Sequence, residues 1–123
     1  MKLFEVREIL KASVATGEGN LDTVVKACAA SDLMSDLLRG SKEDVLVLSG
    51  LNNIQLIRTC LISGSSALVL VRDKKPDEGM ISQARVHGLS LLCTPFTMFT
   101  ACGRLFRGGL GGVDPAKGSP TGP

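Results

Sequence analysis

Short apolar runs alternate with helix-patterned segments over the central part of the chain. The runs Val45–Leu48, Ala67–Val71 and Leu89–Cys93 are almost free of polar residues, which is typical of parallel strands that are buried on both faces. Apolar residues at helical spacing, with capping signals, predict helices over Asn53–Ser63 and Pro76–His87. Strands that alternate with helices in this way predict right-handed βαβ crossovers and a parallel core of three strands.

The first forty residues predict two further helices and two further strands. A turn cluster separates two β-leaning segments, so we expect an N-terminal hairpin that extends the sheet at its edge. A short helix then has Ser31 or Asp32 as its N-cap and Gly40 in the left-handed position after its end. The predicted segments are a helix at Leu3–Lys11, strands at Ala12–Thr16 and Thr23–Ala29, and a helix at Asp32–Arg39. The predicted fold class is therefore α/β, a small sheet with a parallel βαβαβ core, helices packed on it and hairpin strands at the edge.

The C-terminal part predicts one more helix and then a tail. Thr94 is a natural N-cap and Pro95 a natural first helical residue, so we expect a helix over Phe96–Phe106. From residue 107 onward the chain is rich in glycine and proline. This composition predicts a single domain over residues 1–106, followed by a disordered tail over residues 107–123.

Composition and charge exclude several classes of protein. The chain of 123 residues has four Phe and no Trp or Tyr, and its net charge of +2 comes from interspersed charges of both signs. A nucleic-acid-binding surface needs exposed aromatic rings or a basic stripe, so we expect none. The N-terminal residues include several charges, and no apolar run approaches the roughly 20 residues of a membrane span. The sequence predicts a soluble, cytoplasmic protein.

The four cysteines and the single histidine give weak signals for chemistry. Cys28, Cys60, Cys93 and Cys102 form no CxxC pair, and their spacing matches no common metal-binding pattern. We interpret them as reduced thiols in the core and expect no metal and no cofactor, although a reactive thiol stays an alternative. His87 falls in the last predicted turn of its helix, where it suits the negative end of the helix dipole.

The junction after the first core strand is the best candidate for a ligand site. The carboxyl end of a parallel strand that faces a helix N-terminus is where α/β domains usually bind small ligands. Gly50 would let a ligand approach the backbone, and free N–H groups would point at an anion. In the alternative interpretation Gly50 makes a tight turn and Asn52 caps the helix.

Other strand ends carry polar residues that would lie at the same edge of the sheet. Asp32 and Asp36, four residues apart, would suit a hard cation, although such exposed pairs are usually only solvated. Arg72 ends the second core strand and would reach a ligand, or would be a solvated loop charge. The predicted ligand-binding residues are Ser31, Asp32, Ser49, Gly50, Leu51, Asn52, Asn53, Arg72 and Thr94.

Four segments together resemble the DRTGG domain family, which has the fold of the N-terminal domain of HPr kinase/phosphorylase. They read ASDLMSDLL (30–38), DVLVLSGLNNIQLIRT (44–59), SALVLVRDKKPDE (66–78) and GLSLLCTPFTMFTACGRL (88–105). The Asp-Arg-Thr-Gly-Gly run itself is absent from the sequence. The resemblance implies a dimerising, regulatory or ligand-sensing module of the kind that accompanies CBS domains in regulated pyrophosphatases. Kinase activity is not implied, since the chain has no GxxxxGK[ST] loop.

Three functional hypotheses follow from the residues and the resemblance. The first is a non-catalytic, homodimeric module that senses an anionic metabolite, such as a nucleotide. The second is an accessory subunit that docks on an enzyme complex through a helix such as Phe96–Phe106 and binds no small molecule. Stand-alone members resembling this chain are associated with iron-only hydrogenase genes, which makes such a hydrogenase the implied partner. The third is an enzyme or redox protein that uses Cys93 or Cys102.

Overall fold

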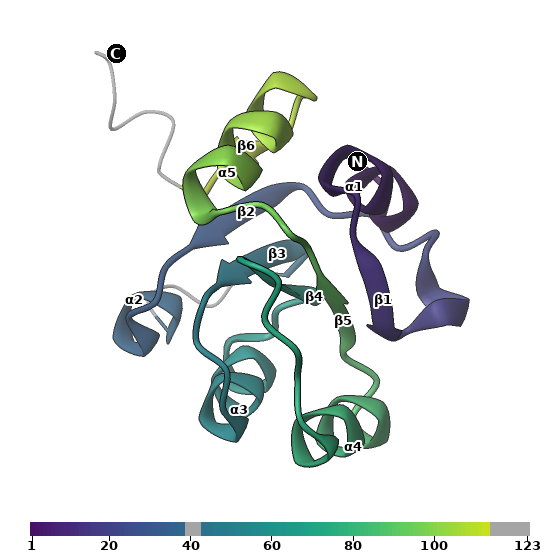
Figure 1. The fold of residues 1–123 in the computed structure, drawn as a ribbon, viewed down its shortest axis with the longest axis vertical. Helices are drawn as coiled ribbons and strands as arrows, with labels where there is room; N and C mark the ends of the chain where they lie inside the picture. Colours follow the sequence, from purple (N-terminus) through teal and green to yellow (C-terminus); the bar gives the residue numbers. More distant parts are fainter. Residues whose placement is uncertain (39–42, 114–123) are drawn as a thin grey trace.

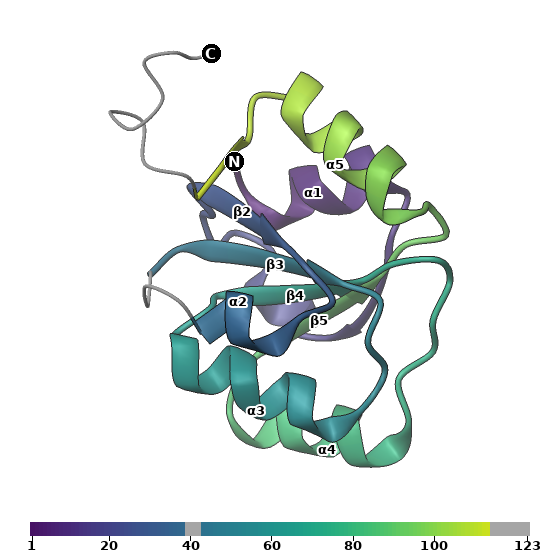
Figure 2. The ribbon, with the colours of Figure 1, turned by 90° about the vertical axis from the view of Figure 1, so that its left-hand side faces the viewer.

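Two layers of helices enclose a six-stranded sheet in the computed structural model, which describes residues 1–38 and 43–113 (Figure 1). Helices α1 and α5 cover one face of the sheet, and α2, α3 and α4 cover the other (Figure 2). In chain order the elements are α1 (Leu3–Leu10), β1 (Ser13–Thr16), the 3₁₀ turn η1 (Glu18–Asn20), β2 (Ala27–Ala30), α2 (Met34–Leu38), β3 (Val45–Ser49), α3 (Ile54–Ser63), β4 (Ala67–Leu70), α4 (Glu78–Val86), β5 (Ser90–Cys93), α5 (Met98–Arg107) and β6 (Gly111–Gly112).

The strands lie in the order β1-β5-β4-β3-β2-β6. Strand β1 pairs with β5 in the antiparallel sense, and every other neighbouring pair is parallel. The chain therefore steps from β2 to β5 through three helices on one face, and α5 then returns over the other face to β6. This confirms the predicted α/β class, with a mostly parallel sheet and helices packed on it.

Every residue of β3, β4 and β5 is buried, as their apolar runs predict. Successive side chains of a strand point to opposite faces of the sheet. Leu46 and Leu48 consequently pack in the core under α1 and α5, whereas Val45 and Val47 pack in the core under α3 and α4. The strands carry no polar face because both faces are covered.

The predicted N-terminal hairpin is wrong. Strand β1 is an edge strand, as predicted, but it pairs with β5, while β2 pairs with β3 and β6 at the other side of the sheet. The segment that joins the two strands runs past the start of α1, where Lys2 forms an isolated bridge with Val24. Both strands contribute to the sheet, but β3, β4 and β5 lie between them.

Helix starts and the C-terminal boundary also differ from the predictions. Asp77, not a residue before Pro76, caps α4, and α5 begins at Met98 rather than after Pro95. The chain beyond Phe106 is also structured, because Leu110 is buried and Gly111–Gly112 pair with β2. The remaining predicted tail, residues 114–123, and the predicted helix end at Arg39 and Gly40 lie outside the described residues.

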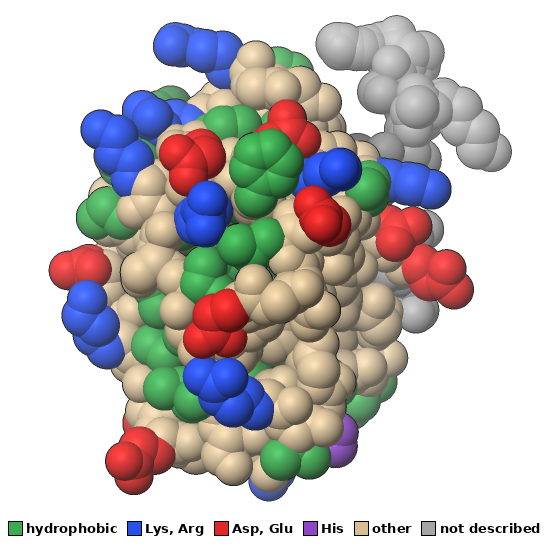
Figure 3. Space-filling model, turned by 90° about the vertical axis from the view of Figure 1, so that its right-hand side faces the viewer, with side chains coloured by type: hydrophobic (Ala, Val, Ile, Leu, Met, Phe, Trp, Pro, Cys, Tyr) green, Lys and Arg blue, Asp and Glu red, His purple; other side chains and the backbone are tan. Residues whose placement is uncertain are grey.

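The surface around α1 and β1 carries charges of both signs between apolar side chains, as Figure 3 shows. Of the helices in residues 1–38 and 43–113, none is both long and apolar enough to cross a bilayer.

Candidate functional site

The predicted site residues meet at one edge of the sheet, where the parallel strands end. Ser31 directly follows β2, Ser49 is the last residue of β3, and Thr94 directly follows β5. Arg72 lies two residues after the end of β4. Four strand ends therefore bring together residues that are spread over more than half of the sequence, because parallel strands place their carboxyl ends at the same edge.

Asp32 is bound to the junction after β3. Its Oδ1 accepts hydrogen bonds from the backbone N–H of Gly50 and, at 3.2 Å, from Ser49 Oγ. Ser49 Oγ also accepts a bond of 3.2 Å from the N–H of Leu51. The carboxylate of Asp32 is exposed while Ser49 and Gly50 are buried, so one side of it is fixed by the protein and the other faces solvent.

Arg72 reaches the same point from the neighbouring strand. A Cβ added to Gly50 would lie 2.8 Å from a guanidinium nitrogen of Arg72 and 3.3 Å from each carboxylate oxygen of Asp32. A side chain at position 50 would therefore push the end of the Arg72 side chain aside and press on the Asp32 carboxylate. An exposed carboxylate and an exposed guanidinium thus flank a buried glycine at the end of β3.

The loop that carries Arg72 has an unusual backbone. Arg72 and Asp73 both have positive φ angles, 59° and 58°, a conformation that non-glycine residues adopt rarely and at a cost. The N–H of Arg72 donates to the carbonyl of Phe96 at 2.7 Å, and that of Asp73 donates to the carbonyl of Thr94 at 2.8 Å. These bonds to the β5–α5 loop hold the strained turn in place. Sequence reasoning missed Phe96, because its contribution is a backbone carbonyl that no local pattern marks.

The two asparagines of the junction have structural partners. Asn53, and not Asn52, caps α3, since its Oδ1 accepts from the N–H of Leu56 at 3.0 Å. The side-chain amide of Asn52 donates to the carbonyl of Lys75 at 2.9 Å. Asn52 therefore joins the β3–α3 junction to the loop after β4.

Thr94 lies at the predicted edge but supports the structure from inside. It is fully buried, and its hydroxyl donates to the carbonyl of Leu10 at 2.6 Å. The predicted capping role belongs to Thr97, whose hydroxyl accepts from the N–H of Thr100 at the start of α5. Thr94 accordingly joins the β5–α5 loop to the end of α1 and does not face solvent.

Asp32, which precedes α2, and Asp36 within α2 bind different partners in the protein. Asp32 binds Gly50 and Ser49, whereas Asp36 accepts from the hydroxyl of Ser31 at 3.2 Å. Among the described residues, no group of three or more His, Cys, Asp or Glu side chains is placed to hold a metal ion. His87 is the C-cap of α4, as its position in the sequence predicts.

Burial keeps the cysteine thiols protonated. It raises the pKa of Cys28 and of Cys60 to about 12, and it also raises the pKa of Cys93 and Cys102. The thiolate is the nucleophilic form, so thiols of this kind are poor nucleophiles at neutral pH. The hypothesis of a reactive Cys93 or Cys102 has no support from these environments.

An exposed carboxylate and an exposed guanidinium thus lie side by side where β3 leads into α3. No family model matches the chain, and no curated protein matches it. A solved structure does resemble it, namely the CBS and DRTGG domains of the regulatory region of Clostridium perfringens pyrophosphatase complexed with its activator, diadenosine tetraphosphate.

The likeness to that structure concerns the fold. The TM-score is 0.71 at 17% sequence identity, and the match covers 85% of this chain but only 45% of the other. The chain thus spans less than half the length of its structural neighbour. The fold is DRTGG-like, and the expected α/β arrangement is confirmed.

Proposed function

We propose that this chain is a non-catalytic regulatory module that binds a nucleotide or another phosphorylated metabolite at the carboxyl edge of its sheet. The observation that carries the proposal is the convergence of Asp32 and Arg72 on the buried Gly50. The Asp32 carboxylate accepts hydrogen bonds and the Arg72 guanidinium binds anions. Both side chains are exposed.

In this proposal, different residues bind the phosphate and the sugar of the ligand. The N–H of Gly50 already donates to Asp32, so a phosphate placed there would meet a carboxylate. The phosphate would instead bind the guanidinium of Arg72 and N–H groups in the first turn of α3 other than that of Leu56, which Asn53 caps. The open side of the Asp32 carboxylate would accept hydrogen bonds from sugar hydroxyls. A nucleotide supplies both kinds of group.

The structural neighbour supports the same class of ligand. It is a regulatory region in complex with a nucleotide activator, diadenosine tetraphosphate. We further propose that the chain is a member of the DRTGG family and that it acts in the cytoplasm as a homodimer. These finer points rest on the resemblance of the four sequence segments and need their own tests.

Calorimetry and thermal unfolding with AMP, ADP, ATP and adenosine test the proposal. A ligand present at 1,000 times its Kd should raise the free energy of unfolding by about 4 kcal/mol. We expect Asp32→Ala to weaken all four ligands, and Arg72→Gln to weaken the three nucleotides while leaving adenosine unchanged. Arg107→Gln, at the far end of α5, is the matched control for loss of one positive charge. The proposal is wrong if no ligand at millimolar concentration changes the melting temperature.

Two exposed aromatic side chains favour a second candidate function, a protein-interaction subunit. Phe99 is 87% exposed and Phe106 is 75% exposed, although both are large apolar residues on the same helix. They lie seven residues apart, which places them on one side of α5, opposite the buried Ala101 and Leu105. A surface of this kind is typical of a site where another protein docks.

The candidate partners are a second copy of this chain and a subunit of an enzyme complex, such as an iron-only hydrogenase. Sedimentation of the purified chain tests whether it forms a dimer. Co-purification from native extract tests whether it binds a subunit of an enzyme complex. Replacing Phe99 and Phe106 by Ser should abolish the interaction, while replacing the exposed Val86 of α4 should not. A monomer that captures no partner would refute this second function.

A further inference from the structure

A separate cavity lies at the opposite end of the sheet, where β1 ends and β5 begins. Its volume is about 220 Å³. One wall is the segment 16–20 at the end of β1, and the other is formed by Ala84, Arg85, Gly88 and Leu89 at the end of α4. The cavity is smaller than the roughly 300–1,000 Å³ that drug-sized ligands occupy, so any ligand must be small.

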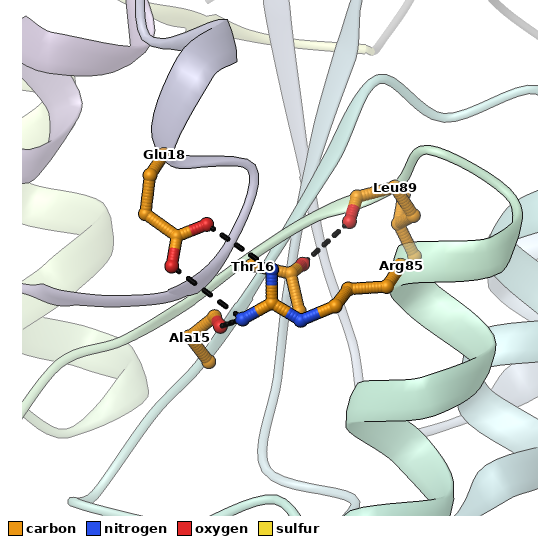
Figure 4. A network of polar contacts seen from close by, with 5 residues as sticks. All are labelled: Ala15, Thr16, Glu18, Arg85 and Leu89. Carbon is orange, nitrogen blue, oxygen red and sulfur yellow. Dashed lines mark hydrogen bonds and ion pairs between the residues drawn. The ribbon is translucent and has the colours of Figure 1, made fainter.

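A side-chain hydrogen bond joins the two walls of the cavity. The buried hydroxyl of Thr16 donates to the carbonyl of Leu89 at 2.7 Å, which fastens β1 to the segment before β5 (Figure 4). Gly17 and Gly88 both have left-handed backbones, and a Cβ on Gly88 or Gly19 would meet no atom within 4 Å. The glycines therefore leave polar backbone groups uncovered at the rim of the cavity.

Two residues that line this cavity, Arg85 and Glu18, carry opposite charges and form an ion pair. Figure 4 shows Arg85 extending from α4 toward Glu18 on η1. Each of the two terminal guanidinium nitrogens of Arg85 lies 3.5 Å from one carboxylate oxygen of Glu18. One of these nitrogens also donates a hydrogen bond of 3.2 Å to the carbonyl of Ala15. Charge-assisted bonds are usually about 2.7–2.9 Å long, so this pair is loose. Both side chains are more than half exposed, and each can exchange its partner for a ligand group.

We propose that this cavity binds a small zwitterion such as a free α-amino acid, with the carboxylate on Arg85 and the ammonium group on Glu18. A simple anion would be repelled by Glu18, and a simple cation would be repelled by Arg85. A ligand that carries both charges replaces the existing ion pair with two new ones.

An NMR titration of the ¹⁵N-labelled full chain with glycine tests this proposal, with acetate and methylamine as probes of each half of the ligand. We expect saturable shifts of the backbone signals of Gly17, Gly19 and Gly88 with glycine, and at least tenfold weaker binding of the two half-ligands. No saturation at about 50 mM glycine, well above a millimolar Kd, would overturn the proposal. Equal shifts with all three probes would overturn it too, because they would report ionic strength only.

Variants locate the binding to the proposed pair. Glu18→Gln and Arg85→Gln should each weaken glycine at least tenfold, and either variant suffices if the other fails to fold. The exposed pair Arg7–Glu8 on α1, 3.1 Å apart, is the matched control, and its neutralised variants should bind glycine unchanged. The result is independent of the nucleotide site, since a nucleotide should shift the signal of Gly50 and leave that of Gly88 in place.

Discussion

Gly17→Ala should be among the most destabilising small substitutions in this chain. Gly17 has a φ of 88°, and a residue with a side chain pays about 1–2 kcal/mol in this region. The new Cβ would also overlap Ser90 Oγ and lie 2.8 Å from Ser90 Cβ and 2.9 Å from Ser90 Cα. Ser90 belongs to β5, which is paired on both sides, so its backbone cannot move away freely.

The expected loss combines these two costs. Relief of an overlap in a packed interior typically costs about 1–3 kcal/mol. Together with the backbone term, the free energy of unfolding should fall by about 2–5 kcal/mol. Domains are typically stable by only about 5–15 kcal/mol, so the variant should unfold at a clearly lower denaturant concentration.

Urea unfolding followed by circular dichroism measures this loss. The midpoint should fall by roughly 1–3 M with an unchanged slope. Gly19→Ala is the matched control, because its Cβ would meet nothing and its backbone is not left-handed; it should stay within about 0.5 kcal/mol of the native chain. Ser90→Ala should partly rescue Gly17→Ala in a double-mutant cycle. A Gly17→Ala variant as stable as Gly19→Ala would refute the reasoning.

Three further predictions concern buried and titrating groups. Thr94→Val should lower the free energy of unfolding by about 1–3 kcal/mol in the same urea assay, because the carbonyl of Leu10 loses its donor; an unchanged midpoint would contradict this. Cys28 and Cys60, with pKa values of about 12, should resist iodoacetamide in the native chain at neutral pH and react only in denaturant, as mass spectrometry would show. The folded-state pKa of Glu18 lies below its usual 4.5, chiefly through its own backbone N–H and then through its ion-pair partner. Its stabilising effect is therefore present above that pH and lost as the pH falls through the folded-state pKa, so Glu18→Gln should flatten the acid limb of a stability–pH curve, and identical curves would contradict this.

The parallel core could be predicted from sequence because burial on both faces leaves a distinct pattern. Runs such as Val45–Leu48 have no polar alternation, and only a strand between two helical layers tolerates this. Turn residues give similar local information, since Gly64 ends α3 in the left-handed conformation that glycine commonly adopts just after a helix. These elements depend on local chemistry that can be read in a window of ten residues.

Pairing between distant segments could not be predicted in the same way. Strands β1 and β2 are separated only by a turn cluster, which is the usual signal of a hairpin, yet they lie on opposite sides of the sheet. Likewise, the glycines of β6 resemble a flexible tail until Leu110 is seen buried in the core under α5. In both cases the outcome depends on which surface α1 and α5 cover, and no local pattern reports that.

At the candidate site, too, the sequence predicts the positions of residues but not the contacts between distant ones. The strand ends could be located from sequence, and with them Asp32, Gly50 and Arg72. The sequence could not predict that the N–H of Gly50 donates a hydrogen bond to the Asp32 carboxylate. This contact reverses the expected role of the junction, because a backbone N–H that would bind a ligand anion is used to hold a carboxylate. Under the proposed function, recognition of an anion would depend on Arg72, whose strained turn is held by a hydrogen bond to the carbonyl of Phe96. Loss of the guanidinium should therefore remove selectivity for phosphate without disturbing the fold.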